Sequence, residues 1–229
     1  MLNQVLIEEF ASDLKIAPLN IIREYLEIET LYYLSQCKLS EHIIFYGGTA
    51  LRLAYQSFRF SEDLDFLLET DDASNKKELK QALQTMAQNN KGVAVEEIFE
   101  KRNTIFGLLH IENELLKHAI RIKIEICKKK NGVKSENFLL ASPINNKDVI
   151  FKTADLESLH KMKETAIKNR NMPRDWFDYW YLCQKLHAKN LIQKKFLFNK
   201  KEFENDLKRW LPRDKWKIIK TVIDFYENN

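Results

Sequence analysis

Apolar residues recur every three or four positions at the start of the chain, which predicts that helices lead. The pattern covers residues 2–14 and, after Pro18, residues 19–37. This period places the apolar side chains of each segment on one helix face, where a core can cover them. Residues 75–90 carry a more polar pattern of the same kind. Helices should therefore both precede and interrupt the strands.

Short apolar or alternating segments predict strands between these helices and the middle of the chain. They cover residues 42–46, 60–69, 93–103, 104–112 and 119–127. The last segment alternates most strictly, and its polar face carries Arg121, Lys123 and Glu125. Asn131 and Gly132 then mark a turn within residues 128–133.

Helical patterns dominate from Asp155 onward, and the strand signal nearly vanishes. We therefore expect a domain boundary near residue 154. Residues 1–154 would form a mixed α/β domain with N-terminal helices, and residues 155–229 a helical domain. The expected fold class is α+β, with a mixed sheet flanked by helices and followed by a C-terminal helical bundle.

Two of the five glycines stand together at the end of a predicted strand. Gly47 and Gly48 follow the strand at 42–46, and Thr49 opens a segment with helical spacing. Glycines at such a turn let backbone N–H groups approach a phosphate, and a helix N-terminus favours its negative charge. The turn therefore predicts a phosphate site to which Thr49 adds a hydroxyl, although such a sequence alone is more often a plain tight turn.

Two aspartates follow on the next predicted strand. Asp63 and Asp65 are two positions apart, so their side chains should share one face. Carboxylate oxygens are hard ligands that suit Mg²⁺, and Glu125 is a candidate third carboxylate. Metal ions held there would activate a hydroxyl and stabilise a leaving pyrophosphate, as nucleotidyl transfer requires. Taken singly, each acid also fits a solvated strand face.

The helical half places charged residues where its helices should be buried. Lys163 falls on the apolar face of the helix that starts near residue 156, and Lys161 falls opposite. A lysine on a buried face needs an anion, either a carboxylate or a bound phosphate, unless it extends to the edge of the face. Pro173 suits the first turn of the next helix, whose apolar surroundings also require a partner for Asp178.

Composition adds few constraints. The 37 basic and 33 acidic residues give a formal net charge of +4, which allows a polyanionic partner without requiring one. The three cysteines stand far apart, which argues against a disulfide framework and a zinc site. The chain starts without a signal-peptide pattern, and no stretch approaches the roughly 20 apolar residues of a membrane span. We expect a cytoplasmic protein.

Three stretches resemble motifs of the AbiEii/AbiGii toxin family of nucleotidyltransferases, within the polymerase-β-like superfamily. They are FYGGTAL at 45–51, RFSEDLDF at 59–66 and KETAIKNRNMPRDWFD at 163–178. They are similar to the family's Gly-Gly-Ser/Thr turn, its Arg-x-Ser-x-Asp-x-Asp strand, and its Lys-x-x-Ala and Arg-Asp-x-x-Asp helices. The resemblance runs from about residue 25 to residue 185.

The resemblance implies a nucleotide site at the glycine turn. At matching positions, Gly47, Gly48 and Thr49 would hold the phosphates of a nucleoside triphosphate, and Ser61 would assist. Lys163 would contact the triphosphate from the helical half.

The resemblance also implies a catalytic metal site. Asp63 and Asp65 would bind Mg²⁺ or Mn²⁺, and Glu125 stands where polymerase-like folds have a third acid. Lys163 and Asp178 would complete the catalytic set at the third and fourth motif positions. The active site would then lie between the two predicted domains.

The family's characterised members are toxins of bacterial toxin–antitoxin and phage-defence systems, and some transfer nucleotides to the 3′ end of tRNA. The resemblance therefore implies an RNA acceptor and a cognate antitoxin for this chain. Two alternatives remain open at this point. One is a small-molecule nucleotidyltransferase with an acidic acceptor pocket, and the other is a non-catalytic nucleotide-binding module.

A basic stretch near the C-terminus favours the RNA acceptor. Residues 185–220 contain 12 Lys or Arg against four Asp or Glu, with Phe196, Phe198, Trp210 and Trp216 interleaved. Positive charge attracts phosphate backbones, and exposed aromatic rings stack on unpaired bases. The alternative is that these helices turn their aromatic rings into a core and their lysines toward solvent.

Overall fold

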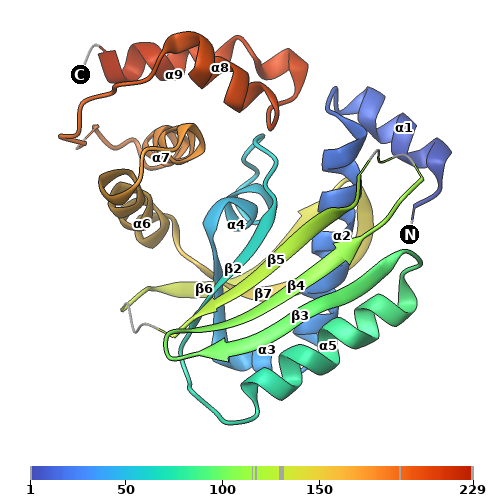
Figure 1. Cartoon of the computed structure of the whole chain (residues 1–229). Coiled ribbons are helices and arrows are strands. Elements are labelled where there is room, and N and C mark those ends of the chain that lie inside the picture. The colour runs from blue at the N-terminus through green and yellow to red at the C-terminus, as the bar shows by residue number, and fades with distance from the viewer. Residues whose placement is uncertain (1, 115, 117, 129–131, 191, 228–229) are drawn as a thin grey trace.

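The computed structural model describes residues 2–114, 116, 118–128, 132–190 and 192–227, whose arrangement Figure 1 shows. Its helices stand before, between and after the strands. They are α1 (Gln4–Asp13), α2 (Pro18–Ser35), α3 (Leu39–His42), α4 (Gly47–Leu53), α5 (Asn75–Asn89), α6 (Leu156–Asn169), α7 (Pro173–Leu186), α8 (Lys200–Lys208) and α9 (Ile218–Glu227), with a short 3-10 helix at Arg213–Lys215. Pro18 and Pro173 each open a helix, where the missing N–H costs no hydrogen bond.

The strands of the described chain form one mixed sheet of seven, in the order β3-β4-β5-β2-β1-β7-β6. They are β1 (Ile43–Tyr46), β2 (Asp63–Leu68), β3 (Val93–Lys101), β4 (Thr104–Ile111), β5 (Ile120–Cys127), β6 (Ser135–Ser142) and β7 (Asn145–Ala154). β2 runs parallel to β5, and β1 runs parallel to β7, while the other neighbours are antiparallel. The strand with both aspartates therefore lies in the middle of the sheet.

Helices α2 and α5 cover one face of the sheet, behind and below it in Figure 1. Leu26, Leu83, Phe66 and Ile124 belong to the apolar cluster that joins these two layers. Gly107 in β4 lacks a side chain at a point where a Cβ would come within 2.7 Å of Leu83 Cδ1. The missing side chain lets α5 pack closely against β4.

The opposite face is covered only over part of its width. Leu51 of α4, Leu159 of α6 and Leu182 of α7 form a second apolar cluster with residues of β1 and β2. No described helix crosses in front of β3, β4 and β5 in Figure 1. On β4 the side chains of this open face are half-buried, whereas the alternate ones, which face α5, are buried. An open strip of sheet therefore lies beside β2.

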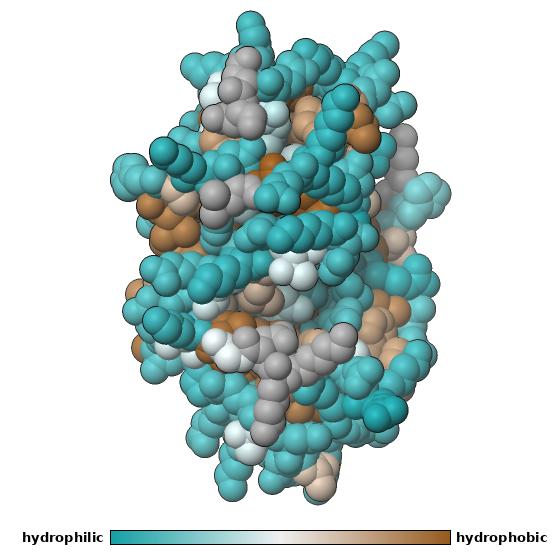
Figure 2. Space-filling model, turned by 90° about the vertical axis from the view of Figure 1, so that its left-hand side faces the viewer, coloured by the Kyte–Doolittle hydropathy of each residue, from teal (hydrophilic) through white to brown (hydrophobic). Residues whose placement is uncertain are grey.

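The C-terminal helices pack around aromatic side chains of α7. Trp176 is fully buried and makes edge-to-face contacts with Phe196, Phe198 and Tyr226. Phe196 and Phe198 are therefore half-buried against this core, which favours the second of the two interpretations that the sequence allowed. The surface on the left of Figure 1, seen face-on in Figure 2, is mainly hydrophilic, with apolar side chains in separate small patches. None of the described helices has the length and apolar content needed to cross a bilayer.

The α+β class and the C-terminal helices are confirmed, and every helix and strand predicted above lies within a few residues of its expected place. Among residues 1–154, three elements were not predicted: α3, β6 and β7. Of the predicted turn, Asn131 lies outside the described residues, and Gly132 has a positive φ of 56°. The division into two domains near residue 154 stays a prediction.

Candidate active site

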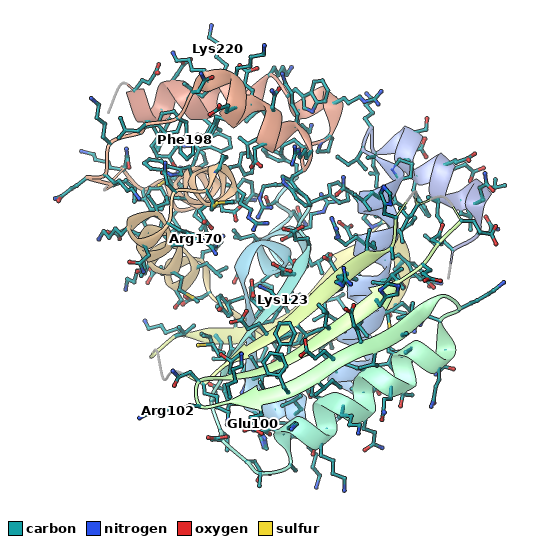
Figure 3. The ribbon with its side chains drawn as sticks, in the orientation of Figure 1. Glu100, Arg102, Lys123, Arg170, Phe198 and Lys220 are labelled. Carbon is teal, nitrogen blue, oxygen red and sulfur yellow. The ribbon has the colours of Figure 1, made fainter. Side chains whose placement is uncertain are left out.

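A cavity of about 740 Å³ opens between the sheet and helix α6, a size typical of small-ligand sites. Strands β2 and β5 supply Asp63, Asp65 and Glu125 to its lining, and α6 supplies Lys163. Figure 3 labels Lys123 on the sheet side and Arg170 on the helical side of this region. Residues far apart in the sequence thus converge on one space.

Asp63 and Asp65 lie on the same face of β2, as predicted, with the buried Leu64 between them. The parallel register places Asp63 beside Lys123 and Asp65 beside Glu125 on β5. Lys123 Nζ lies 3.4 Å from Asp63 Oδ2 and 3.3 Å from Glu125 Oε2. One ammonium therefore stands between two of the three carboxylates that the sequence nominated as metal ligands.

The environment of the two aspartates disfavours their negative charge. Burial raises the pKa of Asp65 to about 6, and the charge of Asp63 adds to this rise while Lys123 opposes it. Burial also raises the pKa of Asp63, partly offset by Lys123. A further cation that enters the site would stabilise the ionised form of such buried carboxylates.

Both glycines of the turn leave space for side chains of the site. Gly47 has a φ of +89°, and a Cβ there would come within 2.8 Å of Asp65 Oδ2. A Cβ on Gly48 would overlap the Arg59 guanidinium and lie 2.8 Å from Ser61 Oγ. The packing of Asp65, Arg59 and Ser61 therefore requires glycine at both positions, whether or not a phosphate binds there.

Thr49 does not reach the cavity, whereas Gly47, Gly48 and Ser61 line it. Thr49 is fully buried, and its hydroxyl donates a hydrogen bond of 2.6 Å to the backbone carbonyl of Asp63. The structure thus gives the Thr49 hydroxyl a positioning role, and its contact with a phosphate stays a prediction. This hydrogen bond ties the start of β2 to α4.

Lys163 is buried, and its partners are carboxylates, as one of the sequence alternatives predicted. Its Nζ lies 2.9 Å from Asp175 Oδ1 and 2.7 Å from Asp178 Oδ2. Arg170 donates to Asp175 from the other side, with Nε 2.6 Å from Oδ2. Arg59 donates two hydrogen bonds of 2.7 Å to the two carboxylate oxygens of Asp178. Three cations and two carboxylates thus form one network, which is buried except for Arg170.

Asp178 belongs to this network but does not line the cavity. Its side chain is fully buried, so it has no free oxygen to offer a ligand. Burial would raise the pKa of Asp178, but Arg59 and Lys163 outweigh burial and lower it. Burial acts likewise on Asp175, where Lys163 and Arg170 lower the pKa to about 2. Both carboxylates are therefore held ionised, and Asp178 positions the cations that face the cavity.

Three cations of the site received no role from the sequence. Arg59 and Arg170 both stand inside the stretches that resembled family motifs, and that was the available signal. Lys123 was recognised only as part of a polar strand face. Lys161, expected on the face opposite Lys163, is exposed but also lines the cavity. A lysine near the mouth of a cavity can be exposed and still face a ligand.

The sequence profile of one family matches residues 29–221, which is most of the chain. Its description is "Nucleotidyl transferase AbiEii toxin, Type IV TA system". This chain belongs to the AbiEii family. It is therefore a nucleotidyltransferase of a toxin family, as the three motifs implied. No curated protein sequence matches the chain significantly.

Solved structures share the AbiEii chain's fold. JHP933 from Helicobacter pylori is 20% identical and superposes with a TM-score of 0.56, over 93% of this chain and 81% of that one. MenT4, the nucleotidyltransferase toxin Rv2826c from Mycobacterium tuberculosis H37Rv, is 16% identical with a TM-score of 0.60, over 89% of this chain and 68% of that one. At these identities the likeness establishes the fold.

Nucleotidyltransferases generally use a nucleoside triphosphate and a divalent metal, which needs hard oxygen ligands. Within the described residues, no three His, Cys, Asp or Glu side chains are grouped to hold a metal. Asp63 and Asp65 still offer two hard carboxylates on one face, and Gly47 leaves room beside Asp65 Oδ2. These two residues fit an ion whose remaining ligands are water and phosphate oxygens.

Proposed function

We propose that this protein transfers a nucleoside monophosphate from a nucleoside triphosphate to the 3′ end of an RNA, in a reaction that depends on Mg²⁺ or Mn²⁺. The observation that carries the proposal is that an acidic wall and a basic wall face each other across one cavity. Asp63 and Asp65 face this cavity from the sheet, and Lys163 and Arg170 face it from the helices.

In this proposal Asp63 and Asp65 hold the divalent cation. When bound, such an ion makes an acceptor hydroxyl more acidic and neutralises charge on the reacting phosphate. Glu125 becomes a third ligand only where Lys123 releases it, because Lys123 Nζ is 3.3 Å from its carboxylate. The raised pKa values of both aspartates support a cation site, since a cation relieves the cost of their charge.

The triphosphate would lie between the glycine turn and the start of α7. Gly47, Gly48 and Ser61 line that side of the cavity, and Lys163 and Arg170 line the other. The Arg170 side chain is 56% exposed, so it can reach a ligand while it holds Asp175. The acceptor oxygen would bond to the α-phosphorus as the bond to the bridging oxygen breaks, and pyrophosphate would leave toward these cations.

A tRNA or another structured RNA with an unpaired 3′ end is the acceptor that we propose. The basic C-terminal stretch supports an RNA, since its cations outnumber its acids threefold. Phe196 and Phe198 do not support base stacking, because their rings pack against the aromatic core around Trp176. Trp216 is 37% exposed, with Lys208 Nζ 5.3 Å from its ring centroid. Within this stretch, Trp216 would be the side chain that stacks on an RNA base.

The family supports a role as the toxin of a type IV toxin–antitoxin system, and we propose that role here, in the cytoplasm and with a cognate antitoxin. One experiment tests the chemistry and the acceptor together. The protein is incubated with each α-labelled nucleoside triphosphate, Mg²⁺ or Mn²⁺, and total RNA or total protein. We expect label in RNA, and a label found only in a small molecule would favour the small-molecule alternative.

A further inference from the structure

One row of side chains crosses five strands of the sheet and passes through the active site. In register, Phe99 pairs with Phe106, Phe106 with Glu125, Glu125 with Asp65, and Asp65 with Tyr46. Residues paired in register point to the same face of a sheet. Strands lie about 4.8 Å apart, so Phe106 stands about 10 Å from Asp65 and Phe99 about 14 Å. Two aromatic rings are thus aligned with the catalytic aspartate.

Phe99 and Phe106 lie on the open strip of the sheet and outside its core. On β4 the neighbours Ile105 and Gly107 are buried against α5, while Phe106 is half-buried on the opposite face. Neither phenylalanine belongs to an apolar cluster of the described residues. They stack on each other, with ring centroids 4.6 Å apart and an interplanar angle of 18°. Phe99 therefore covers one face of Phe106, whose side chain stays half-buried.

Cations stand beside this aromatic pair. Lys101 Nζ lies 4.7 Å from the ring centroid of Phe99. Lys101 and Arg102 are exposed, and neither forms an ion pair within the described part of the chain. Figure 3 shows Arg102 projecting away from the sheet at the β3–β4 turn. The neighbouring acid Glu100 is neutralised by Lys128, whose Nζ is 2.5 Å away. Lys101 and Arg102 therefore add positive charge beside the pair at the β3–β4 turn, while the exposed Glu97, paired in register with Leu108, adds a negative charge farther along β3.

We propose that this row binds the unpaired 3′ end of the acceptor strand, with a base stacked on Phe106 and its phosphates toward Lys101 and Arg102. This inference rests on the proposed nucleotidyl transfer to RNA. Stacked nucleotides advance by about 3.4 Å each, so two or three of them span the distance from Phe106 to Asp65. Every base has a π-face, so such stacking accepts many sequences.

A single-stranded nucleic acid explains the row better than a protein partner does. A protein surface would need an apolar patch, but it would not need aromatic rings in register with a catalytic carboxylate at nucleotide spacing. The cations beside the pair also match a phosphate backbone. Phe106 and Leu108 are half-buried on the same face of β4, and no described helix crosses in front of this face in Figure 1. The terminal hydroxyl would then reach the aspartates from the sheet side.

Two RNA probes test the inference: a hairpin with a short unpaired 3′ tail and the same hairpin with a blunt end. Affinity is measured at low salt for the wild type, Phe106→Ala and Phe106→Trp. Leu139→Ala is the matched control, because Leu139 is 57% exposed on β6 at the other edge of the sheet. We expect Phe106→Ala to weaken binding of the tailed hairpin about tenfold or more, since base–aromatic stacking contributes that much.

The other variants and probes should isolate stacking. Phe106→Trp should restore the affinity for the tailed hairpin, and Leu139→Ala should leave it unchanged. The blunt hairpin and a fluorescent nucleoside triphosphate should bind wild type and Phe106→Ala equally. Equal affinity of Phe106→Ala and wild type for the tailed hairpin would overturn the inference. So would loss of a dimer in Phe106→Ala by light scattering without a change in RNA affinity.

The same measurements separate this inference from the proposed function. If the tailed hairpin binds through Phe106 but no nucleotide is transferred, the RNA-binding role of the row is supported and the proposed nucleotidyl transfer is contradicted. If Phe106→Ala transfers nucleotide to RNA at the wild-type rate, the proposed reaction is supported and the RNA-binding role of the row is contradicted.

Discussion

The Arg59 guanidinium and the Asp178 carboxylate form two hydrogen bonds of 2.7 Å, although 119 positions separate them in the chain. Both side chains are almost fully buried, so neither charge is solvated. Arg59 lies directly under Gly48, and Asp178 also holds Lys163. This pair links the glycine turn of the sheet to the cations of the helices.

Breaking this pair should destabilise the protein. Arg59→Met and Asp178→Asn each leave a buried charge without its main partner, which costs about 3–5 kcal/mol of unfolding free energy. Urea denaturation at pH 7 measures the loss. The double variant should lose less than the sum of the two single variants, because they share one interaction. Additive losses would show that the two residues act independently.

Asp63→Asn and Asp65→Asn should each abolish nucleotide transfer while the protein stays folded. Both substitutions keep the shape of the side chain and remove the charge that a cation needs. Because burial raises the pKa of Asp65 to about 6, the folded state disfavours its charge at pH 7. Asp65→Asn should therefore unfold at a higher temperature than wild type without metal. A folded Asp63→Asn enzyme with full activity would contradict the metal assignment.

Lys163→Met should raise the KM for the nucleoside triphosphate about tenfold or more, since a buried charge is lost beside the phosphates. Lys168→Met is the matched control, because Lys168 lies on the same helix with 58% of its side chain exposed and pairs with Glu164. Lys161 is unsuitable because it lines the cavity. Lys163→Arg, which keeps the charge, should retain more activity. Equal small effects at positions 163 and 168 would remove Lys163 from the site.

Gly48→Ala should displace the Arg59 guanidinium, because the new Cβ would overlap it. Overpacking of this kind costs about 1–3 kcal/mol. Denaturation measured in the Arg59→Met background provides the control, since the overlapping atoms are then absent. We expect Gly48→Ala to cost little further stability there. An equal cost in both backgrounds would mean that the strain lies in the backbone.

Acid should destabilise the protein in a defined window through Asp175. Its pKa is about 2 in the folded state against 3.8 for the ordinary side chain, because Lys163 and Arg170 outweigh burial. A lowered pKa stabilises the folded state above pH 4, and this contribution disappears as pH falls from about 4 to about 2. The loss amounts to about 2 kcal/mol. Asp175→Asn should show a shallower decline of stability over that interval, and a decline as steep as that of wild type would contradict the assignment.

The sequence predicted the parts of the site that depend on one element. The alternation of β2 sufficed to place Asp63 and Asp65 on one face, and helix periodicity sufficed to bury Lys163. Both patterns are local, since they need only the geometry of a strand or a helix. Its partner Asp178 could be nominated as buried, but its engagement by Arg59 required the tertiary structure.

Roles that depend on contacts between elements could not be read from the sequence. Thr49 has a suitable hydroxyl for a phosphate, yet its hydrogen bond to the Asp63 carbonyl follows from how α4 packs on β2. Strands β6 and β7 were not predicted because Leu139 and Ile150, paired in register, are 57% and 65% exposed. Apolar residues on the outer face remove the alternation that identifies a strand.

The position of β7 has a consequence for biosynthesis. Strand β1, which precedes the glycine turn, is hydrogen-bonded in parallel to a strand that ends only at Ala154. The partner of Arg59 is synthesised later still, because it is the carboxylate of Asp178. A nascent chain emerging from the ribosome therefore carries Asp63 and Asp65 through the synthesis of more than 100 further residues before Asp178 exists. The site cannot assemble until translation has passed position 178.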